Sequence, residues 1–354
     1  MIHSKVRFFR GIVLSFGIGL MLNACGSQFT RAASPVAAVE PLQVYFTNPE
    51  SPTAKEYIGG LDEALAADID HARLAVDVAA TRLNLPSLCD ALIHAHQRGV
   101  VVRMLMAPDQ MDTVDVQKLI DAEIPVVAAP GAGRMDDNFV ILDDKVVWTG
   151  SMIFTTSGVY EDESNLIRIS SVQAATEYSA QFERLLTNIP LNPGAATATQ
   201  APTQTVVANP LEIYFSPSDG IDPHLQDLLL GAKESIYFLA YSFTSNDLGD
   251  ALLARAKAGI IVAGVMDSGQ ILSNQGTQFD RFTQAGLEVR KNGNPGLLHD
   301  LFFVIDHSIV VDGSYEFNAG GENPVEENTV IISNPALAAQ FIAEYQRIYS
   351  QAQP

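Results

Sequence analysis

The sequence predicts an α/β fold built from two copies of one structural unit. Apolar strands alternate with amphipathic helices along the chain, which is typical of α/β architecture. The same order of elements occurs twice within the 354 residues. Agreement over about 140 positions in each copy indicates a duplication rather than two unrelated domains.

The first elements of the two copies align at an offset of 160 residues. The strand 76–80, Val-Asp-Val-Ala-Ala, corresponds to the strand 236–240, Ile-Tyr-Phe-Leu-Ala. The helix that follows each strand is expected to end at Gly99 or Gly259, because glycine readily adopts the left-handed conformation that often ends a helix. A further apolar strand is predicted directly after each of these glycines.

The later elements align at an offset of 163 residues. They share an aspartate, a Gly-Ser step and an asparagine: Asp143 with Asp306, Gly150-Ser151 with Gly313-Ser314, and Asn165 with Asn328. Residues 189–209 are rich in proline, alanine, threonine and glutamine and lack periodicity, which predicts a linker. This linker divides the chain into half 1 (41–188) and half 2 (210–354).

The N-terminus has the pattern of an exported lipoprotein. Three basic residues precede an apolar run at 11–22, which is too short for a membrane-spanning helix. The run ends in Leu22-Asn23-Ala24-Cys25, which resembles a bacterial lipobox. Residues 1–24 are therefore predicted to be a signal peptide and Cys25 to be lipidated. The alternative is an ordinary cleaved signal with an incidental cysteine.

A lipidated cysteine would place the protein outside the cytoplasm, anchored to the cell membrane or the outer membrane. Residues 25–40 are then a flexible tether between the lipid and the globular part. Because the chain has two cysteines, lipidation of Cys25 would leave Cys89 without a partner for an internal disulfide.

The charge argues against nucleic acid as a partner. The chain has 21 basic and 41 acidic residues, a net charge of −20. Residues 1–24 contain three of the basic residues and no acidic one, so their removal brings the net charge to −23. Such a negative field repels phosphate backbones.

The stretch 298–333 carries the residues with the clearest chemical pattern. His299 and Asp306 stand seven positions apart, and Gly313-Ser314 and Glu327-Asn328 follow. This spacing resembles the motif of the phospholipase D superfamily, His-x-Lys-x4-Asp followed by Gly-Ser and then Glu-Asn. The lysine position and the asparagine expected after Gly-Ser are different here: they hold Leu301 and Glu316.

The resemblance covers about residues 41–350 and implies a specific architecture and reaction. In that family two α/β halves pack about a pseudo-two-fold axis, and one motif from each half meets in a shared cleft. The reaction implied needs no metal or cofactor. One histidine attacks phosphorus and forms a phosphohistidine, and the other protonates the leaving oxygen. The lysines and the asparagine hold the phosphate oxygens, and the motif aspartates orient the histidines.

The first motif departs further from the family pattern. Asp136 stands at the histidine position and Asn138 at the lysine position, while Asp143 is retained. Gly150-Ser151 is also retained, but Ile153 replaces the following asparagine. The candidate catalytic residues are thus His299, Asp306, Asp136 and Asp143, and the candidate substrate-binding residues are Asn138, Ser151, Asn165, Ser314, Glu327 and Asn328.

These losses predict a protein with little or no catalysis. Removing a nucleophile or its base can cost about 10⁶ in turnover, and each lost oxyanion donor costs about 10² to 10³. We therefore expect a phospholipase D-like lipoprotein that binds a ligand or acts as a scaffold at the cell envelope. The alternative is an active phosphodiesterase that hydrolyses phospholipid through His299. The membrane is an expected partner through Cys25, and phospholipid or another phosphodiester is a candidate ligand.

The carboxylates around the motifs suggest one further hypothesis. Many of them are expected in one cleft: Asp136, Asp137, Asp143, Asp300, Asp306, Glu316 and Glu327. Carboxylates that share a buried cleft cannot all ionise unassisted, and Ca²⁺ takes six to eight oxygen ligands in flexible geometry. The cleft could thus bind a cation in place of an anion. The alternative is that several of these side chains point into solvent.

Overall fold

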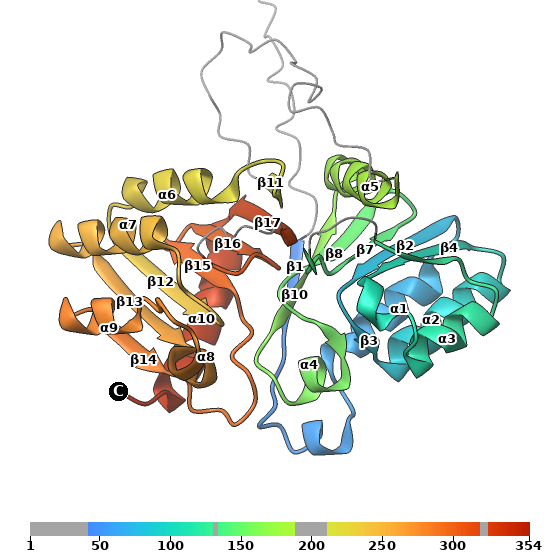
Figure 1. Ribbon diagram of the computed structural model, residues 1–354, viewed down its shortest axis with the longest axis horizontal. Coiled ribbons are helices and arrows are strands. Elements are labelled where there is room, and N and C mark those ends of the chain that lie inside the picture. Colours follow the sequence, from blue (N-terminus) through green and yellow to red (C-terminus); the bar gives the residue numbers. More distant parts are fainter. Residues whose placement is uncertain (1–41, 130–133, 188–210, 319–324) are drawn as a thin grey trace, which may run out of the picture. The chain divides into compact units, whose positions relative to one another are not determined.

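Each half of the chain folds around its own sheet, which confirms the predicted α/β fold of two duplicated halves (Figure 1). The computed structural model describes residues 42–129, 134–187, 211–318 and 325–354. The predicted signal peptide, tether and linker, and with them Cys25, lie outside the described residues. Both halves belong to one compact unit, Val39–Pro354.

The sheet of half 1 is mixed. Its order is β1 (Leu42–Phe46), β10 (Asn165–Ser170), β8 (Val146–Thr149), β7 (Phe139–Leu142), β2 (Ala75–Ala80), β4 (Val101–Met106) and β5 (Val126–Ala128). β2, β4 and β5 are parallel, and the other neighbours are antiparallel. A small separate sheet pairs β3 (Leu83–Asn84) with β9 (Phe154–Thr155).

The sheet of half 2 repeats this arrangement. Its order is β11 (Leu211–Ser216), β17 (Val325–Ser333), β16 (Ile309–Gly313), β15 (Phe302–Ile305), β12 (Ser235–Ala240), β13 (Ile261–Met266) and β14 (Glu288–Lys291). One short strand of half 1, β6 (Arg134–Met135), pairs in parallel with β17. The sheet of half 2 therefore includes two residues of half 1.

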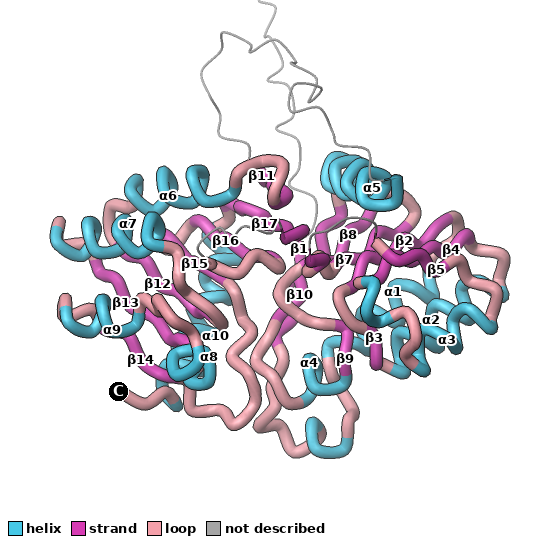
Figure 2. Tube along the Cα trace, in the orientation of Figure 1, coloured by secondary structure: helices cyan, strands magenta, loops and turns pink. Residues whose placement is uncertain are grey.

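Helices lie beside the strands in both halves (Figure 2). Half 1 contains η1 (Ala54–Glu56), α1 (Leu61–His71), α2 (Pro86–Gln97), η2 (Pro108–Gln110), α3 (Val114–Asp121), α4 (Thr156–Tyr160) and α5 (Val172–Thr187). Half 2 contains α6 (Ile221–Gly231), α7 (Asn246–Lys257), α8 (Ser268–Ser273), α9 (Phe279–Gln284) and α10 (Pro335–Gln351). Within these described residues, no helix is both long and apolar enough to cross a bilayer.

Successive residues of a strand point to opposite faces of the sheet, so their side chains belong to two different cores. In β2, Val76 and Val78 belong to a cluster with α1, α2 and α3, whereas Ala79 belongs to a second cluster with α5 and α10. Because both faces are covered, the central strands are mostly apolar, although β2 includes the buried Asp77, which pairs with Arg103 of β4. Half 2 has the matching outer cluster, formed with α6, α7 and α9.

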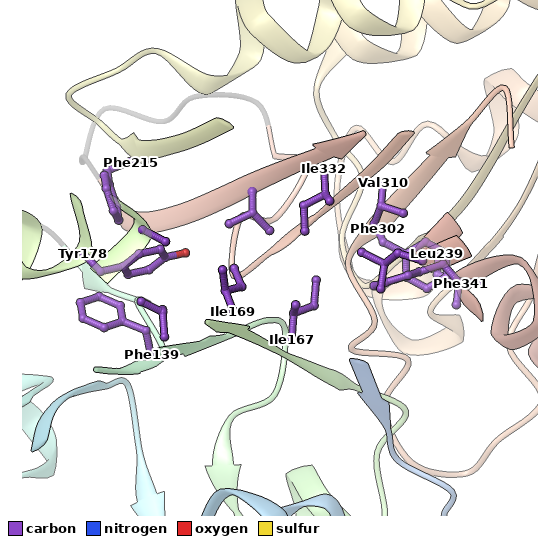
Figure 3. Packing of buried hydrophobic residues seen from close by; sticks show 14 of the residues in the cluster. Phe139, Ile167, Ile169, Tyr178, Phe215, Leu239, Phe302, Val310, Ile332 and Phe341 are labelled. Atoms are coloured by element: carbon purple, nitrogen blue, oxygen red, sulfur yellow. The ribbon is translucent and has the colours of Figure 1, made fainter. Parts of the chain in front are cut away.

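The second cluster joins the two halves. It combines Phe139, Ile167 and Tyr178 of half 1 with Phe302 and Phe341 of half 2 in one buried core (Figure 3). The two sheets thus present their inner faces to a common apolar interior. This packing brings the ends of the strands that carry the two motifs to one place.

Candidate functional site

The two motifs meet at a cavity of about 240 Å³. Half 1 contributes Asp136 and Asn138 to its wall, and half 2 contributes His299 and Ser314. The expectation that Asp136 and His299 face one shared cleft is therefore confirmed.

His299 is held by a hydrogen bond from the other half. Its ring is 9% exposed, and Nδ1 lies 2.7 Å from the carbonyl oxygen of Ser151. A carbonyl oxygen can only accept, so Nδ1 carries a proton, and in the neutral form of the ring the lone pair is on Nε2. The Tyr241 ring lies against the imidazole, with centroids 5.0 Å apart. His299 is thus fixed in one tautomer beside the cavity.

Asp136 is positioned by the short strand that half 1 contributes to the sheet of half 2. Its backbone N–H donates to the carbonyl oxygen of Glu326 at 2.9 Å. Its carboxylate forms an ion pair with Arg134, which also lines the cavity. The residue across the cavity from the retained imidazole is therefore a carboxylate with its own cation.

Neither lysine position provides a cation. The Asn138 amide is engaged by Thr81: its Oδ1 accepts the Thr81 backbone N–H at 3.1 Å, and its Nδ2 donates to the Thr81 hydroxyl at 3.2 Å. Leu301 is 1% exposed and belongs to the core. The positive charges in the wall are instead Arg82 and Arg134, so the cavity retains two guanidinium groups that an anion could contact.

The motif aspartates do not orient the histidine position, so that expectation is wrong. Asp143 and Asp306 lie in the turns of the β7–β8 and β15–β16 hairpins, with φ of 53° and 49°. The Asp306 carboxylate accepts the backbone N–H groups of residues 233–235 at 2.7 to 3.1 Å. Asp143 does the same with residues 73–75. Burial would raise the pKa of both carboxyls, but these donors hold it below the usual value.

Four of the candidate substrate-binding residues are buried away from the cavity wall: Ser151, Asn165, Glu327 and Asn328. Ser151 Oγ accepts the backbone N–H of Asn165 at 3.1 Å, and Ser314 Oγ accepts that of Asn328 at 3.0 Å. The two asparagines then contact the opposite half rather than a ligand. The Gly-Ser serines therefore fix the asparagines, and Ser314 also reaches the cavity.

Glu327 is a buried carboxyl near Glu316 and Asp136, two residues of the cavity wall. Its Oε1 accepts the backbone N–H of Glu316 at 3.2 Å. Burial raises the pKa of Glu327 to about 9, and the nearby charges of Glu316 and Asp136 raise it further. Burial therefore favours the protonated form of Glu327.

The sequence reasoning missed several residues of the wall. Thr81 and Arg82 follow β2, Asp109 and Gln110 follow β4, and Tyr241 follows β12. Ligands of α/β proteins bind outside the carboxyl ends of strands. The positions directly after the predicted strands were therefore a usable signal.

The acidic residues do not gather as the cation hypothesis requires. Asp143 and Asp306 lie in hairpin turns, and Asp137 and Asp300 are fully buried between the halves. In the part of the chain that the structure describes, no group of three or more His, Cys, Asp or Glu residues is placed to hold a metal ion. The proposed exchange of an anion site for a cation site is therefore not supported.

Comparison with known proteins gives one family. The family model described as "Cardiolipin synthase, PLD-like domain" matches the chain twice, over residues 65–186 and 225–349. The mitochondrial cardiolipin hydrolase of Homo sapiens is 29% identical over 126 residues, which are 36% of this chain and 50% of that protein. A phospholipase D of Rickettsia bellii is 27% identical over 131 residues, 37% of this chain and 65% of that protein. The chain thus spans about half to two thirds of the length of these relatives.

A solved structure shares the whole arrangement. Phosphatidylserine synthase of Haemophilus influenzae has a TM-score of 0.66 and 12% identity, and the match covers 88% of this chain and 87% of that one. At this identity the likeness shows a common fold.

Proposed function

Because the chain belongs to the phospholipase D-like family of the cardiolipin synthase type, we propose that it binds a phosphodiester in the shared cavity with little or no turnover. The observation that carries the proposal is Asp136, which stands across the cavity where the family reaction needs a second imidazole. A carboxylate paired with Arg134 has neither the nucleophilic nitrogen of a neutral imidazole nor the acidic proton of an imidazolium.

Binding is supported by the cations that line the same cavity. Arg82 and Arg134 can donate to phosphate oxygens, and guanidinium groups match phosphate geometry. His299 Nε2 adds a third polar contact. The relatives named cardiolipin hydrolase and phospholipase D make a phospholipid head group the leading ligand. The lipidated Cys25 proposed from the sequence would hold this cavity close to a membrane surface, outside the cytoplasm.

Binding is tested with the protein lacking residues 1–25 and a short-chain phosphatidylglycerol, by calorimetry. Arg82→Ala and Arg134→Ala should each weaken binding by about tenfold to a hundredfold, because a hydrogen bond to a charged group contributes about 1.5–3 kcal/mol. The matched control is Arg281→Ala, whose ion pair with Asp250 is exposed. Failure of the wild-type protein to bind, or equal affinities in all variants, would refute the proposal.

A second candidate is a slow phosphodiesterase that uses His299 alone. It is favoured by the hydrogen bond to Ser151, which leaves the Nε2 lone pair free for attack on phosphorus. Turnover of bis(p-nitrophenyl) phosphate distinguishes the two. A rate that disappears in His299→Ala, together with a trapped phosphohistidine, would establish the enzyme; equal rates in both proteins would exclude it.

A further inference from the structure

The junction between the halves contains two polar networks related by the offset of 163 residues. In the first network, Asp137 accepts hydrogen bonds from Asn328 Nδ2 at 2.8 Å and from Gln181 Nε2 at 3.1 Å. Asn328 Oδ1 accepts from the Thr149 hydroxyl at 2.7 Å and from the Tyr178 hydroxyl at 2.9 Å. Each of these buried acceptors has a donor.

The second network has lost three of those donors. Its residues stand at the matching positions: Asp300 for Asp137, Asn165 for Asn328, Glu344 for Gln181, Asp312 for Thr149 and Phe341 for Tyr178. Asn165 Nδ2 donates to Asp300 Oδ1 at 2.8 Å and to Asp312 Oδ1 at 3.0 Å. An amide, a hydroxyl and a phenol have thus been replaced by two carboxyls and a phenyl ring.

Three buried oxygen atoms of the second network have no hydrogen-bond donor. Asn165 Oδ1, Asp300 Oδ2 and Asp312 Oδ2 are buried and have no hydrogen-bond partner among the described residues. Asp300 is 0% exposed and Asp312 is 1% exposed, so bulk water does not reach them. Buried acceptors without donors are rare in folded proteins, and a proton on each carboxyl would supply the missing donors.

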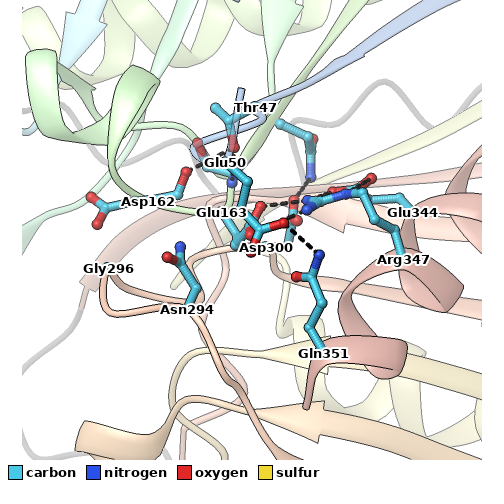
Figure 4. A network of polar contacts seen from close by, with 12 residues as sticks. Thr47, Glu50, Asp162, Glu163, Asn294, Gly296, Asp300, Glu344, Arg347 and Gln351 are labelled. Atoms are coloured by element: carbon cyan, nitrogen blue, oxygen red, sulfur yellow. Dashed lines mark hydrogen bonds and ion pairs between the residues drawn. The ribbon is translucent and has the colours of Figure 1, made fainter. Parts of the chain in front are cut away.

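The charges around the second network also favour a proton on each of the two aspartates. Glu163 and Glu344 both form ion pairs with Arg347 (Figure 4). That guanidinium is already shared between two carboxylates, and Asp300 lies beside them. Glu50 adds a further negative charge near Glu163, and Asp312 and Asp300 face each other across Asn165. No second cation among these groups neutralises the two aspartates.

We propose that Asp300 and Asp312 are both protonated in the folded protein at neutral pH, and that their ionisation at alkaline pH loosens the junction that orients His299. A protonated Asp312 donates to Asn165 Oδ1, as Thr149 does to Asn328. A protonated Asp300 donates to the Glu344 carboxylate, which restores the bond that Gln181 makes in the first network. No metal or other ligand is needed.

The network is connected to the cavity by a short chain of hydrogen bonds. The Asn165 backbone N–H donates to Ser151 Oγ at 3.1 Å, and the Ser151 carbonyl oxygen accepts His299 Nδ1–H at 2.7 Å. Asp300 also follows His299 directly in the chain. A shift of Asn165 away from two ionised carboxylates would therefore displace the group that fixes the imidazole.

The pKa values of the two networks differ in the expected direction. Burial raises the pKa of Asp312 to about 8. Burial, followed by the charge of Glu344, raises the pKa of Asp300 well above its usual value. Asp137 in the first network has a pKa of only about 6, because Asn328 and Gln181 donate to it and oppose the effect of burial.

The sign of the pH dependence follows from these shifts. Both carboxyls bind protons more tightly in the folded than in the unfolded chain, where the pKa is about 3.9. The stabilising contribution of Asp312 is therefore complete at acid pH and is lost as pH rises through about 8, and that of Asp300 is lost as pH rises through its own raised pKa. Between the pKa of the unfolded chain, about 3.9, and the raised pKa of the folded protein, the unfolding equilibrium constant should rise up to about tenfold per pH unit for each carboxyl.

The test uses the variant Asp312→Thr/Glu344→Gln in the otherwise intact chain. These two substitutions introduce the residues that stand at the matching positions of the first network, Thr149 and Gln181. Urea denaturation between pH 6 and pH 8 should show a steep loss of stability in the wild-type protein. The slope should be about one proton smaller in Asp312→Thr and smaller again in the double variant. The control, Asp227→Thr/Glu56→Gln, makes the same exchanges at exposed positions and should keep the wild-type slope.

Two further measurements test the proposal even if the double variant does not fold. Infrared spectroscopy at pH 7 should show the carbonyl band of neutral carboxylic acids in the wild-type protein, and this band should be weaker in Asp312→Thr, which separates Asp312 from the buried Glu327. Modification of His299 by diethyl pyrocarbonate should accelerate as pH rises through about 8. Equal pH slopes in the wild-type protein and Asp312→Thr, or ionised carboxyls throughout at pH 7, would overturn the proposal.

Discussion

Asp306 accepts hydrogen bonds from three successive backbone N–H groups while its own backbone passes through the left-handed region. Asp143 does the same in half 1. Aspartate tolerates this conformation better than most residues because its short carboxylate bonds locally. The residue therefore closes a hairpin and fixes the start of the neighbouring strand in both halves, which explains its presence even where the histidine position is lost.

Replacing this carboxylate should lower stability in a pH-dependent way. Asp306→Asn keeps the turn conformation but loses the charge, and we expect a loss of about 1 kcal/mol at pH 7 because solvent partly screens the site. The lowered pKa means that the carboxylate stabilises the fold above about pH 4 and that this contribution disappears as pH falls. Urea denaturation at pH 7 and pH 3 measures both values. Asp144→Asn, at the exposed turn position next to Asp143 in half 1, should change neither.

Restoring the second imidazole tests whether Asp136 is the residue that limits catalysis. Asp136→His places an acid–base group across the cavity from His299, and general acid catalysis contributes about 10² to 10⁴ in rate. We expect turnover of a chromogenic phosphodiester to rise at least tenfold. Asp136→Asn removes the carboxylate without adding an imidazole and should remain at the wild-type rate. A gain of the same size in Asp136→Asn would identify the negative charge, rather than the missing imidazole, as the obstacle.

At the scale of elements, the Gly-Ser step brings two strands of each sheet into close backbone contact. Gly313 ends β16 with φ of 149°, and a Cβ there would lie 2.3 Å from the carbonyl oxygen of Asn328. Gly150 has the same relation to Asn165, at 2.5 Å. The glycine thus allows the following serine to bond the asparagine backbone, which places that asparagine at the junction.

Adding a methyl group at this position should disturb the whole strand end. Gly313→Ala forces the backbone of Asn328 to move, and we expect a loss of about 3 kcal/mol in the free energy of unfolding. Ligand binding should weaken as well, because Ser314 lines the cavity. Gly231→Ala serves as the control, since a Cβ there meets nothing within 4 Å and the backbone is not left-handed. Equal stability of the two variants would contradict this account of the Gly-Ser step.

The secondary structure and the meeting of the motifs could be predicted from the sequence, because both follow from local patterns and from a repeat. The strand at 236–240 and the helix ending before Gly259 are where the periodicity places them. The roles of Asp306 and Asn165 could not be predicted in the same way. Their partners lie 71 to 147 residues away in the chain, and the contacts exist only after the sheets have packed.

At the scale of the whole molecule, the halves depend on each other for burial and for charge. Arg184 of α5 pairs with Glu326 of half 2, and Arg347 of α10 pairs with Glu163 of half 1. The apolar cluster between the sheets draws on both halves (Figure 3). Separation would expose that cluster and leave buried charges without partners, which is strongly destabilising.

Separated halves should therefore not be stable monomers. A fragment of residues 42–187 is expected to self-associate or to lack a cooperative melt, whereas co-expression with residues 211–354 should give a folded one-to-one complex. Sedimentation velocity and thermal melting measure these outcomes. A monomeric 42–187 fragment with a cooperative transition would show that each half is autonomous.

The difference between the two junction networks has a consequence for the history of the chain. In a symmetric dimer of one half, any substitution appears at both related positions at once, so Asp at the position of Thr149 would have created the donor-poor network twice. A fused chain can keep Thr149 on one side and Asp312 on the other. A duplication within one chain therefore allows one junction to change while the other continues to hold the halves together.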